Sequence, residues 1–298
     1  MTSERRGLVF GGLGVLAFSF TLPATRVAVA DLDSTFVGLG RALVAAALAA
    51  ALLLWKRERV PERRLWPRIS IVAVGVVVGF PLFTALALRD LPSAHSAVIV
   101  GILPAATAAM AVLRGGERPS AGFWLACACG LVSVLVFAVV EGAGRPRVAD
   151  VLVLVAVALC AVGYAEGGAL AREIGGWRVI CWALIFAAPF ILPAVLFSLA
   201  RTGVSEGLSG GTGAWLGFAY VSVVSMFLGF FAWYAGLAAG GVASVGQIQL
   251  VQPVLTVLWS AALLGEEVTL YTFLAALLVL SSVALTQRTR VRPAVNRK

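Results

Sequence analysis

Long apolar stretches separated by short polar loops occupy almost the whole of this chain of 298 residues. Each reaches 17 residues or more, the length that a helix needs to cross the hydrocarbon core of a membrane. Charged residues make up only 12% of the chain, about half of their share in soluble domains. We therefore predict an all-α polytopic membrane protein with ten transmembrane helices, at residues 7–25, 34–55, 67–88, 93–113, 120–140, 149–171, 178–200, 213–236, 242–263 and 269–287.

One segment of this pattern occurs twice, 149 positions apart. Residues 91–118 align without a gap on residues 240–267, so that Pro104 falls on Pro253 and Glu117 on Glu266. A fixed internal offset indicates a duplicated architecture, which in an apolar chain is typical of transporters with a site near the bilayer midplane. We predict two five-helix repeats, residues 1–145 and 146–298, in one bundle. Because five is an odd number, the second repeat is inverted relative to the first.

The positions of Lys and Arg predict how the chain is oriented. If the N-terminus is cytoplasmic, 17 basic residues share its side, Arg41 lies within a span, and five basic residues lie opposite, namely Arg26, Arg89, Arg145, Arg147 and Arg201. Basic residues gather in cytoplasmic loops. We therefore predict a bacterial inner-membrane protein with both termini in the cytoplasm. The net charge of +9 then reflects topology, and no nucleic-acid partner is expected.

The first span has an alternative interpretation. Arg5 and Arg6, the apolar stretch after them and the segment Ala28-Val29-Ala30 follow the order of a cleavable signal peptide. Cleavage would leave nine spans and would remove the counterpart of the sixth span. The prediction of ten spans assumes that the first span is retained.

A short motif opens each repeat. Phe18 stands eight residues before Arg26, and Tyr164 stands eight residues before Arg172. With Arg41, the proline-bearing spans and the Gly-Glu turns, this pattern resembles EamA-type members of the drug/metabolite transporter superfamily, which usually have Trp at the aromatic position. The resemblance implies a basket of helices whose first, third, fourth, sixth, eighth and ninth spans line a central cavity. It also implies export of small metabolites. Within the family, this chain resembles the branch that exports amino acids, including aromatic ones.

The ninth predicted span carries the densest polar pattern. Gln249, Gln252, Thr256 and Ser260 recur at steps of three and four residues and share one helix face, whereas Gln247 lies on another. An amide in hydrocarbon needs a partner, so these groups either line the cavity or bond to a neighbouring helix. A proline has no N–H, so the carbonyl four residues before it loses its hydrogen bond within the helix. We expect the spans with the two repeated prolines, Pro104 and Pro253, to act as hinges or gates.

Three ionisable side chains lie inside predicted spans, where such groups mark functional sites. His95, the only histidine, is either a cavity-facing donor or proton site, or an interfacial residue bonded to a neighbour. Glu166 either binds a cationic group or a coupling proton, or pairs with Arg172 or another basic residue of the same side. Arg41 is expected to neutralise helix-end carbonyls or an acid such as Asp33.

Aromatic residues are further candidates for the cavity wall, although packing against lipid is equally compatible with their positions. The candidates inside the spans are Phe18, Phe80, Phe83 and Tyr164. Residues near the ends of the eighth span either bind ligand or anchor the helix at the interface. These are Tyr220, Trp233 and Tyr234.

The sequence has no enzymatic constellation: HExxH, a Walker-type loop and GxSxG are all missing. The four cysteines lie in apolar runs without a CxxC spacing, so we expect no metal or other cofactor. Without a nucleotide-binding segment, a substrate, proton or ion gradient must drive any transport.

We predict a secondary transporter or facilitator that exports small metabolites, amino acids in the first place, by alternating access around a central cavity. One alternative is a proton-coupled antiporter for drugs or cations in which Glu166 is essential. An alternative of another class is an intramembrane enzyme or a non-transporting membrane scaffold. The expected partners are a small-molecule substrate and the lipid bilayer, and the sequence leaves open whether copies of the chain associate.

Overall fold

The computed structural model describes residues 3–115, 120–141 and 147–289, and every regular element in these ranges is a helix. The elements before residue 145 are α1 (Ser3–Ser19), α2 (Thr21–Asp31), η1 (Phe36–Gly40), α3 (Arg41–Trp55), η2 (Arg63–Leu65), α4 (Trp66–Val72), η3 (Ala73–Gly79), α5 (Phe80–Ala87), α6 (Ser93–Val100), α7 (Leu103–Gly115) and α8 (Ala121–Glu141). Those after residue 146 are α9 (Val148–Ile174), α10 (Gly176–Thr202), α11 (Val204–Gly207), α12 (Thr212–Ala219), η4 (Tyr220–Leu228), α13 (Gly229–Ile248), α14 (Val251–Leu264) and α15 (Leu270–Thr289).

Within the described ranges, eight helical segments are long and apolar enough to cross a membrane. They are Arg5–Asp31, Phe36–Trp55, Arg63–Ala87, Ser93–Arg114, Ala121–Val140, Val148–Ile174, Gly176–Thr202 and Thr212–Ala239. Two further apolar helices, Val251–Leu264 and Leu270–Thr286, are shorter. They lie at the ninth and tenth predicted spans. The predicted start of the ninth span at residue 242 is wrong, because α13 continues to Ile248 and α14 begins at Val251. The fold is that of a polytopic α-helical membrane protein, and the number of ten spans stays a prediction.

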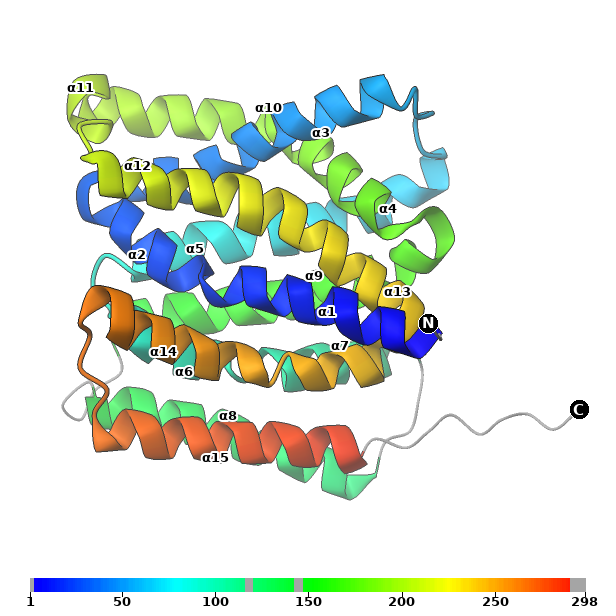
Figure 1. Ribbon diagram of the computed structural model, residues 1–298, viewed down its shortest axis with the longest axis vertical. Helices are drawn as coiled ribbons and strands as arrows, with labels where there is room; N and C mark the ends of the chain where they lie inside the picture. Colours follow the sequence, from blue (N-terminus) through cyan, green and yellow to red (C-terminus); the bar gives the residue numbers. More distant parts are fainter. Residues whose placement is uncertain (1–2, 116–119, 142–146, 290–298) are drawn as a thin grey trace, which may run out of the picture.

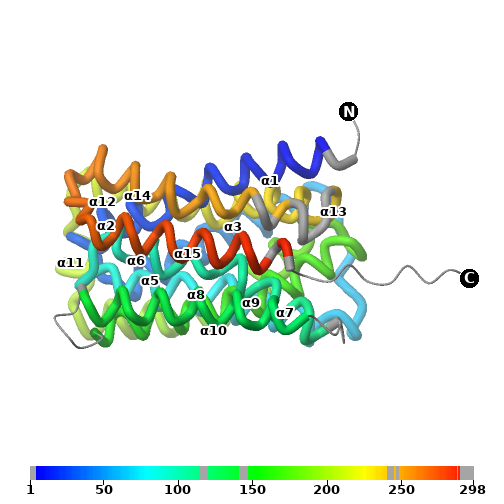
Figure 2. The backbone as a smooth tube through the Cα atoms, turned by 90° about the horizontal axis from the view of Figure 1, so that it is seen from below, coloured from blue at the N-terminus to red at the C-terminus, as the bar shows by residue number. Residues whose placement is uncertain are grey.

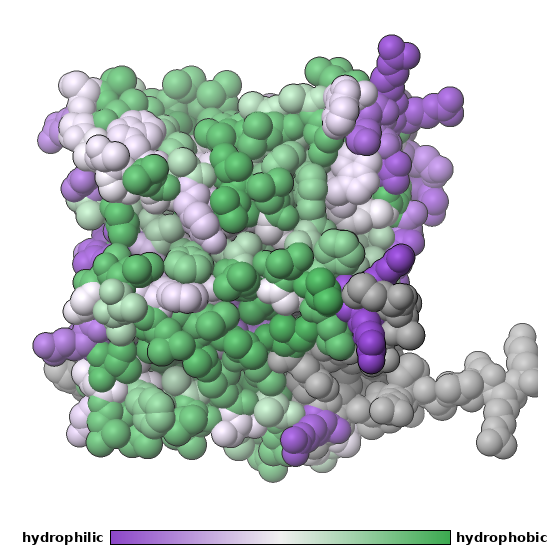
Figure 3. All heavy atoms as spheres, in the orientation of Figure 1, coloured by the Kyte–Doolittle hydropathy of each residue, from purple (hydrophilic) through white to green (hydrophobic). Residues whose placement is uncertain are grey.

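The face of the molecule in Figure 3 is apolar across its middle, with polar residues gathered towards its two ends. Large apolar side chains such as Leu125, Phe190 and Phe197 are exposed on the outside of the bundle. In water such a surface would aggregate, whereas in a bilayer it faces lipid chains. The start of α1 and the end of α15 lie at the same end of the bundle (Figures 1 and 2).

The helices pack in pairs that connect the two halves of the chain (Figure 1). α1 packs against α13, α5 against α9, and α6 against α14. At opposite edges of the bundle, α3 lies beside α10 and α8 beside α15. Each pair joins one helix before residue 145 to one after residue 146. The two segments are therefore interleaved in a single bundle.

Two helices are broken at corresponding positions of the 149-residue repeat. α6 ends at Val100 and α7 begins at Leu103, whereas α13 ends at Ile248 and α14 begins at Val251. Pro104 and Pro253 both lie in the first turn after the break. Proline has no N–H to donate and its ring clashes with the carbonyl four residues earlier, but it is tolerated in the first turn of a helix. The prolines therefore fix where these helices break.

Wide helical turns also recur at corresponding positions. η1, η3 and η4 are π-helical. Shifted by 149 positions, η3 at 73–79 becomes 222–228 and falls within η4 at 220–228. π-Helical turns are rare and are frequent at functional sites, and both of these segments adjoin the cavity described below.

Glycines allow α1 and α13 to touch through their backbones. A Cβ atom on Gly236 would lie 2.6 Å from the Gly11 nitrogen and 2.9 Å from its Cα atom, so the two helices would have to separate. We expect Gly236→Ala to lower the free energy of unfolding by about 1–3 kcal/mol, the usual effect of overpacking. The control is Gly12→Ala, because a Cβ atom at Gly12 meets nothing within 4 Å. Equal melting temperatures of the two purified variants would contradict this packing.

Candidate functional site

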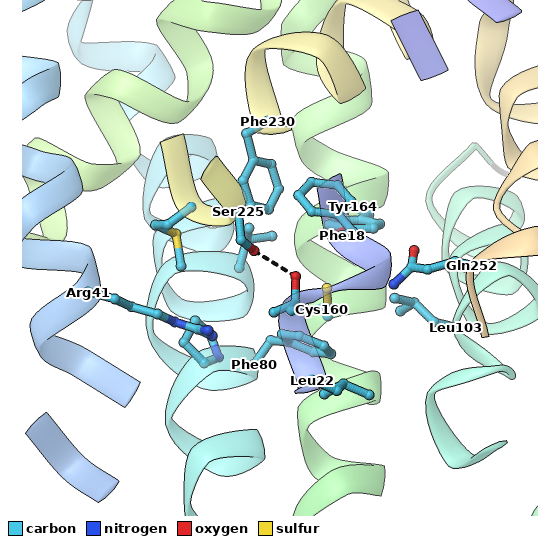
Figure 4. Close-up of a pocket in the computed structure, with 14 residues that line it drawn as sticks. Phe18, Leu22, Arg41, Phe80, Leu103, Cys160, Tyr164, Ser225, Phe230 and Gln252 are labelled. Atoms are coloured by element: carbon cyan, nitrogen blue, oxygen red, sulfur yellow. Dashed lines mark hydrogen bonds between the residues drawn. The ribbon is translucent and has the colours of Figure 1, made fainter. Parts of the chain in front are cut away.

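A cavity lies in the middle of the bundle, between the two halves of the chain (Figure 4). Its empty volume is about 440 Å³, but the part open to the centre of a water molecule is only about 30 Å³. That space holds about two water molecules. In this conformation the accessible space in the cavity is therefore smaller than a metabolite. Its lining consists of Phe18, Thr21, Leu22, Arg41, Val76, Phe80, Pro81, Leu103, Cys160, Tyr164, Ser225, Met226, Phe230 and Gln252.

The lining comes from the helices that the family resemblance implies. Residues of the first, third, fourth, sixth, eighth and ninth predicted spans all contribute to it. That expectation is confirmed for this cavity. Arg41, at the start of α3, adds a residue from the second span.

One side of the cavity is aromatic. Phe18 of α1 and Tyr164 of α9 both face Phe230 of α13, with ring centroids 4.8 Å and 6.1 Å from it (Figure 4). Behind them, the ring centroid of Trp233 lies 6.2 Å from that of Phe18 and 5.6 Å from that of Tyr164. The two aromatic positions that open the repeats thus meet in one cluster, which offers a flat apolar wall.

The other sides of the cavity combine polar groups with apolar side chains such as Leu22, Phe80 and Leu103. The hydroxyls of Thr21 and Ser225 are 2.8 Å apart, so α2 and η4 are bonded to each other across the cavity wall (Figure 4). Two buried atoms of lining residues, Nε of Arg41 and Oε1 of Gln252, have no hydrogen-bond partner in the described part of the chain. Buried polar atoms nearly always have a partner, so these two atoms indicate a ligand or water in the cavity.

The expectation that Asp33 neutralises Arg41 is wrong. The Asp33 carboxylate accepts hydrogen bonds from the Phe36 N–H at 2.8 Å and from the Ser198 hydroxyl at 2.9 Å. It therefore caps the turn before η1 and ties it to α10. For the Arg41 guanidinium the described residues offer one hydrogen bond, a long one of 3.5 Å to the Thr25 hydroxyl.

The polar face of the ninth predicted span divides into two parts. Gln252 lines the cavity, and Gln249 is buried in the break between α13 and α14. Thr256 donates to the Ser19 carbonyl at 2.8 Å, and the Ser260 hydroxyl lies 2.8 Å from that of Ser93. The last two residues thus bond to neighbouring helices, and their role is structural. The side chain of Gln247 lies outside the described residues.

The remaining aromatic candidates do not line this cavity. Tyr220 donates to the Ala17 carbonyl at 2.9 Å, which fixes the start of η4 against α1. Trp233 and Tyr234 are fully buried, and their Nε1 and hydroxyl atoms lack partners among the described residues. Phe83 is half-buried on α5. Trp233 and Tyr234 pack behind the aromatic wall of the cavity, whereas Tyr220 and Phe83 are not part of its lining.

His95 lies away from the cavity in a buried pair. Its Nε2 atom is 2.6 Å from Oδ1 of Asp150, and its ring packs against that of Phe137 with centroids 4.6 Å apart and the planes tilted by 35°. Both partners are almost inaccessible to solvent, at 5% for His95 and 1% for Asp150. The other carboxylate oxygen of Asp150 accepts the Arg147 N–H at 2.8 Å and caps α9. The histidine is therefore bonded to a neighbour, and it joins α6 to the start of α9.

Glu166 lies nearer the opposite end of α9 and also joins the two halves. Its carboxylate, 1% exposed, forms ion pairs with Arg68 of α4 and Arg114 of α7. Arg68 also pairs with Glu173, which directly follows Arg172 and lies about two turns after Glu166 on α9. The partners of Glu166 are thus two basic residues of the first half, and its side chain does not line the cavity. We call the group Arg68, Arg114 and Glu166 the basic-end latch.

A second ion pair at this end joins the same two halves. Arg178 of α10 donates to both carboxylate oxygens of Glu58, at 2.9 Å and 2.7 Å. The Arg178 guanidinium lowers the pKa of the Glu58 carboxyl, chiefly through this hydrogen bonding. At the other end, Glu266 of the second Gly-Glu turn accepts the N–H groups of Ser93 and Ala94 at 2.9 Å and 2.8 Å and caps α6. Its first-half counterpart, Glu117, lies outside the described residues.

Comparisons with known proteins agree with this arrangement. The family model described as the EamA-like transporter family matches residues 5–139 and again residues 147–288. The chain belongs to the EamA-like transporter family. It is 45% identical over 268 residues to the "Uncharacterized transporter YdeK" of Bacillus subtilis (strain 168), covering 90% of this chain and 92% of that protein. A crystal structure with 19% identity covers 94% of this chain and 97% of its own, with a TM-score of 0.61, and shows the fold alone.

Several residues of this EamA-like site were missed by sequence reasoning. Thr21 lies three residues after Phe18, and Cys160 lies four residues before Tyr164, so the helical period could have placed both in the wall. Asp150 carries no such signal, because only the fold brings it to His95. In the described ranges, no three His, Cys, Asp or Glu side chains form a group that could hold a metal ion.

Proposed function

We propose that this EamA-like protein is a secondary transporter that exports small amphipathic metabolites, amino acids in the first place, by alternating access around the central cavity. The observation that carries the proposal is the composition of the cavity wall. Three aromatic rings face a space that is also lined by Arg41 and Gln252, whose Nε and Oε1 atoms have no hydrogen-bond partner among the described residues. A solute with an apolar body and a polar head matches both parts of this wall. The outward direction rests on the family resemblance.

Contacts between the two halves hold both ends of the bundle together, which supports alternating access. The basic-end latch and the Glu58–Arg178 pair join the halves at one end. At the other end, Asp33 holds Ser198, and Glu266 holds the start of α6. Opening one set while the other stays closed would expose the cavity to one side at a time.

The matched breaks and π-helical turns suggest where this movement takes place. The breaks before Pro104 and Pro253, and the segments η3 and η4, are the irregular parts of four helices that line the cavity. Their recurrence at one offset, together with the two matches of one family model, supports two equivalent halves moving against each other. Since the basic residues gather where α1 begins, we place that end in the cytoplasm.

The proton-coupled antiporter for drugs or cations is less well supported. Such a mechanism needs an acidic side chain in the substrate cavity, and the described lining contains none. Glu166, the residue that this alternative requires, is neutralised by Arg68 and Arg114.

Counterflow of labelled amino acids into liposomes that contain only this protein tests the proposal. We expect exchange of aromatic or aliphatic amino acids without an imposed gradient, and no exchange in liposomes without the protein. Flux that requires a pH gradient would favour the antiporter. Absence of flux for every amino acid, from protein that is folded in the membrane, would contradict the proposed substrate.

A further inference from the structure

Arg41 is the buried charge of this bundle for which the described residues provide no counter-charge. Its side chain is 1% exposed and extends into the cavity (Figure 4). None of the described carboxylates lies within 4.0 Å of its guanidinium nitrogens. Arg68 and Arg114, by contrast, both pair with Glu166.

The hydrogen bonds of Arg41 are also incomplete. A guanidinium has five N–H donors, whereas the described residues provide one acceptor at 3.5 Å, the Thr25 hydroxyl. That distance is longer than the 2.7–3.2 Å of ordinary N–H···O bonds. Thr25 itself is occupied, because it donates to the Thr21 carbonyl at 2.6 Å. Most of the N–H donors of the Arg41 guanidinium therefore have no acceptor among the described residues.

A guanidinium stays charged in proteins, and an unpaired charge in a low-dielectric interior is strongly unfavourable. Its planar fork matches the two oxygens of a carboxylate. We propose that Arg41 binds the carboxylate of the transported substrate. This inference rests on the proposed function and narrows its substrate class to carboxylate-bearing solutes.

The rest of the cavity indicates how such a solute lies. Gln252 enters from the side opposite Arg41, with its amide nitrogen directed towards the cavity (Figure 4). Rotation of the amide by half a turn brings the unpartnered Oε1 to the cavity, where it can accept a hydrogen bond from an ammonium group. The rings of Phe18, Tyr164 and Phe230 form the apolar wall between them. An α-amino acid with an apolar side chain supplies all three complementary groups. The contact of Arg41 with the carboxylate is the strongest of the three, because both groups in it are charged.

The test compares three ligands of one shape in counterflow of labelled phenylalanine. Phenylalanine carries both head groups, 3-phenylpropionate only the carboxylate, and phenethylamine only the ammonium. With the natural protein, we expect 3-phenylpropionate to compete at least about tenfold better than phenethylamine. Arg41→Gln should raise the half-saturation concentration for phenylalanine about 10- to 100-fold, as expected for a lost charged hydrogen bond. It should also abolish the preference for the acid, whereas Arg41→Lys should keep part of it.

Arg201→Gln is the matched control, because it removes the same charge from an exposed site at the end of α10. If Arg41→Gln does not fold, the melting temperature of the natural protein provides the test: the acid should raise it more than the amine does. Unchanged half-saturation in folded Arg41→Gln, or an amine that competes as well as the acid, would overturn the assignment.

The two proposals can fail separately. If phenylalanine is not transported but 3-phenylpropionate raises the melting temperature in an Arg41-dependent way, the role of Arg41 stands and the amino-acid substrate is wrong. If phenylalanine is transported equally well by the natural protein and Arg41→Gln, the proposed function stands and the role of Arg41 is wrong.

Discussion

Replacing Glu166 by Gln should loosen the end of the bundle at which α1 begins. The carboxylate is buried and neutralises Arg68 and Arg114, whose side chains are 29% and 42% exposed. Without it, two guanidinium groups of the first half lose their shared counter-charge, and of these ion pairs only Arg68–Glu173 still joins α9 to the first half. Breaking a buried pair lowers stability by about 3–5 kcal/mol, and partial exposure of both arginines places the expected loss at or below about 3 kcal/mol.

The melting temperature of the purified variant measures this effect. Glu62→Gln is the control, because it removes the same charge from the Glu62–Arg64 pair, in which both side chains are 71% exposed. We expect no measurable change from the control and a clear drop from Glu166→Gln. Natural stability of Glu166→Gln would show that the basic-end latch does not hold the two halves together.

Replacing Pro104 and Pro253 together by Ala should slow transport without reducing the amount of folded protein. Alanine restores the missing N–H and favours a continuous helix, so the two breaks should close and the moving segments stiffen. We expect the counterflow rate per folded molecule to fall about tenfold, equivalent to a barrier higher by about 1.4 kcal/mol.

Two other prolines provide the control for this effect. Pro189 and Pro193 lie inside α10, which continues from Gly176 to Thr202 without a break. Replacing both by Ala should leave the rate near that of the natural protein. If the Pro104 and Pro253 double variant transports at the natural rate, the breaks are not hinges.

The sequence predicts the features that depend on periodicity and composition. Apolar length predicts membrane-crossing helices, and proline chemistry predicts where α6–α7 and α13–α14 break. The eight-residue spacing in Phe18–Arg26 and Tyr164–Arg172 identifies two aromatic residues that meet at Phe230. In these cases the signal lies within one helix and can be read from the chain.

Features that depend on contacts between distant helices could not be predicted. His95 and Asp150 are 55 residues apart, and Glu166 pairs with Arg68 rather than with its neighbour Arg172. Wide turns also disturb the helical period: Ser225 and Phe230 line the same cavity five residues apart because η4 is π-helical. The free guanidinium of Arg41 becomes apparent only when Asp33 is seen to be engaged elsewhere.

The central claim is that the substrate passes through the cavity, and Cys160 offers a direct test because this thiol lies in the wall. The measurement is counterflow by a variant that keeps Cys160 as its only cysteine, before and after treatment with a small methanethiosulfonate reagent. The account predicts that the reagent blocks flux, that substrate slows the block, and that a variant without cysteines is unaffected. Full flux after complete modification of Cys160 would contradict it.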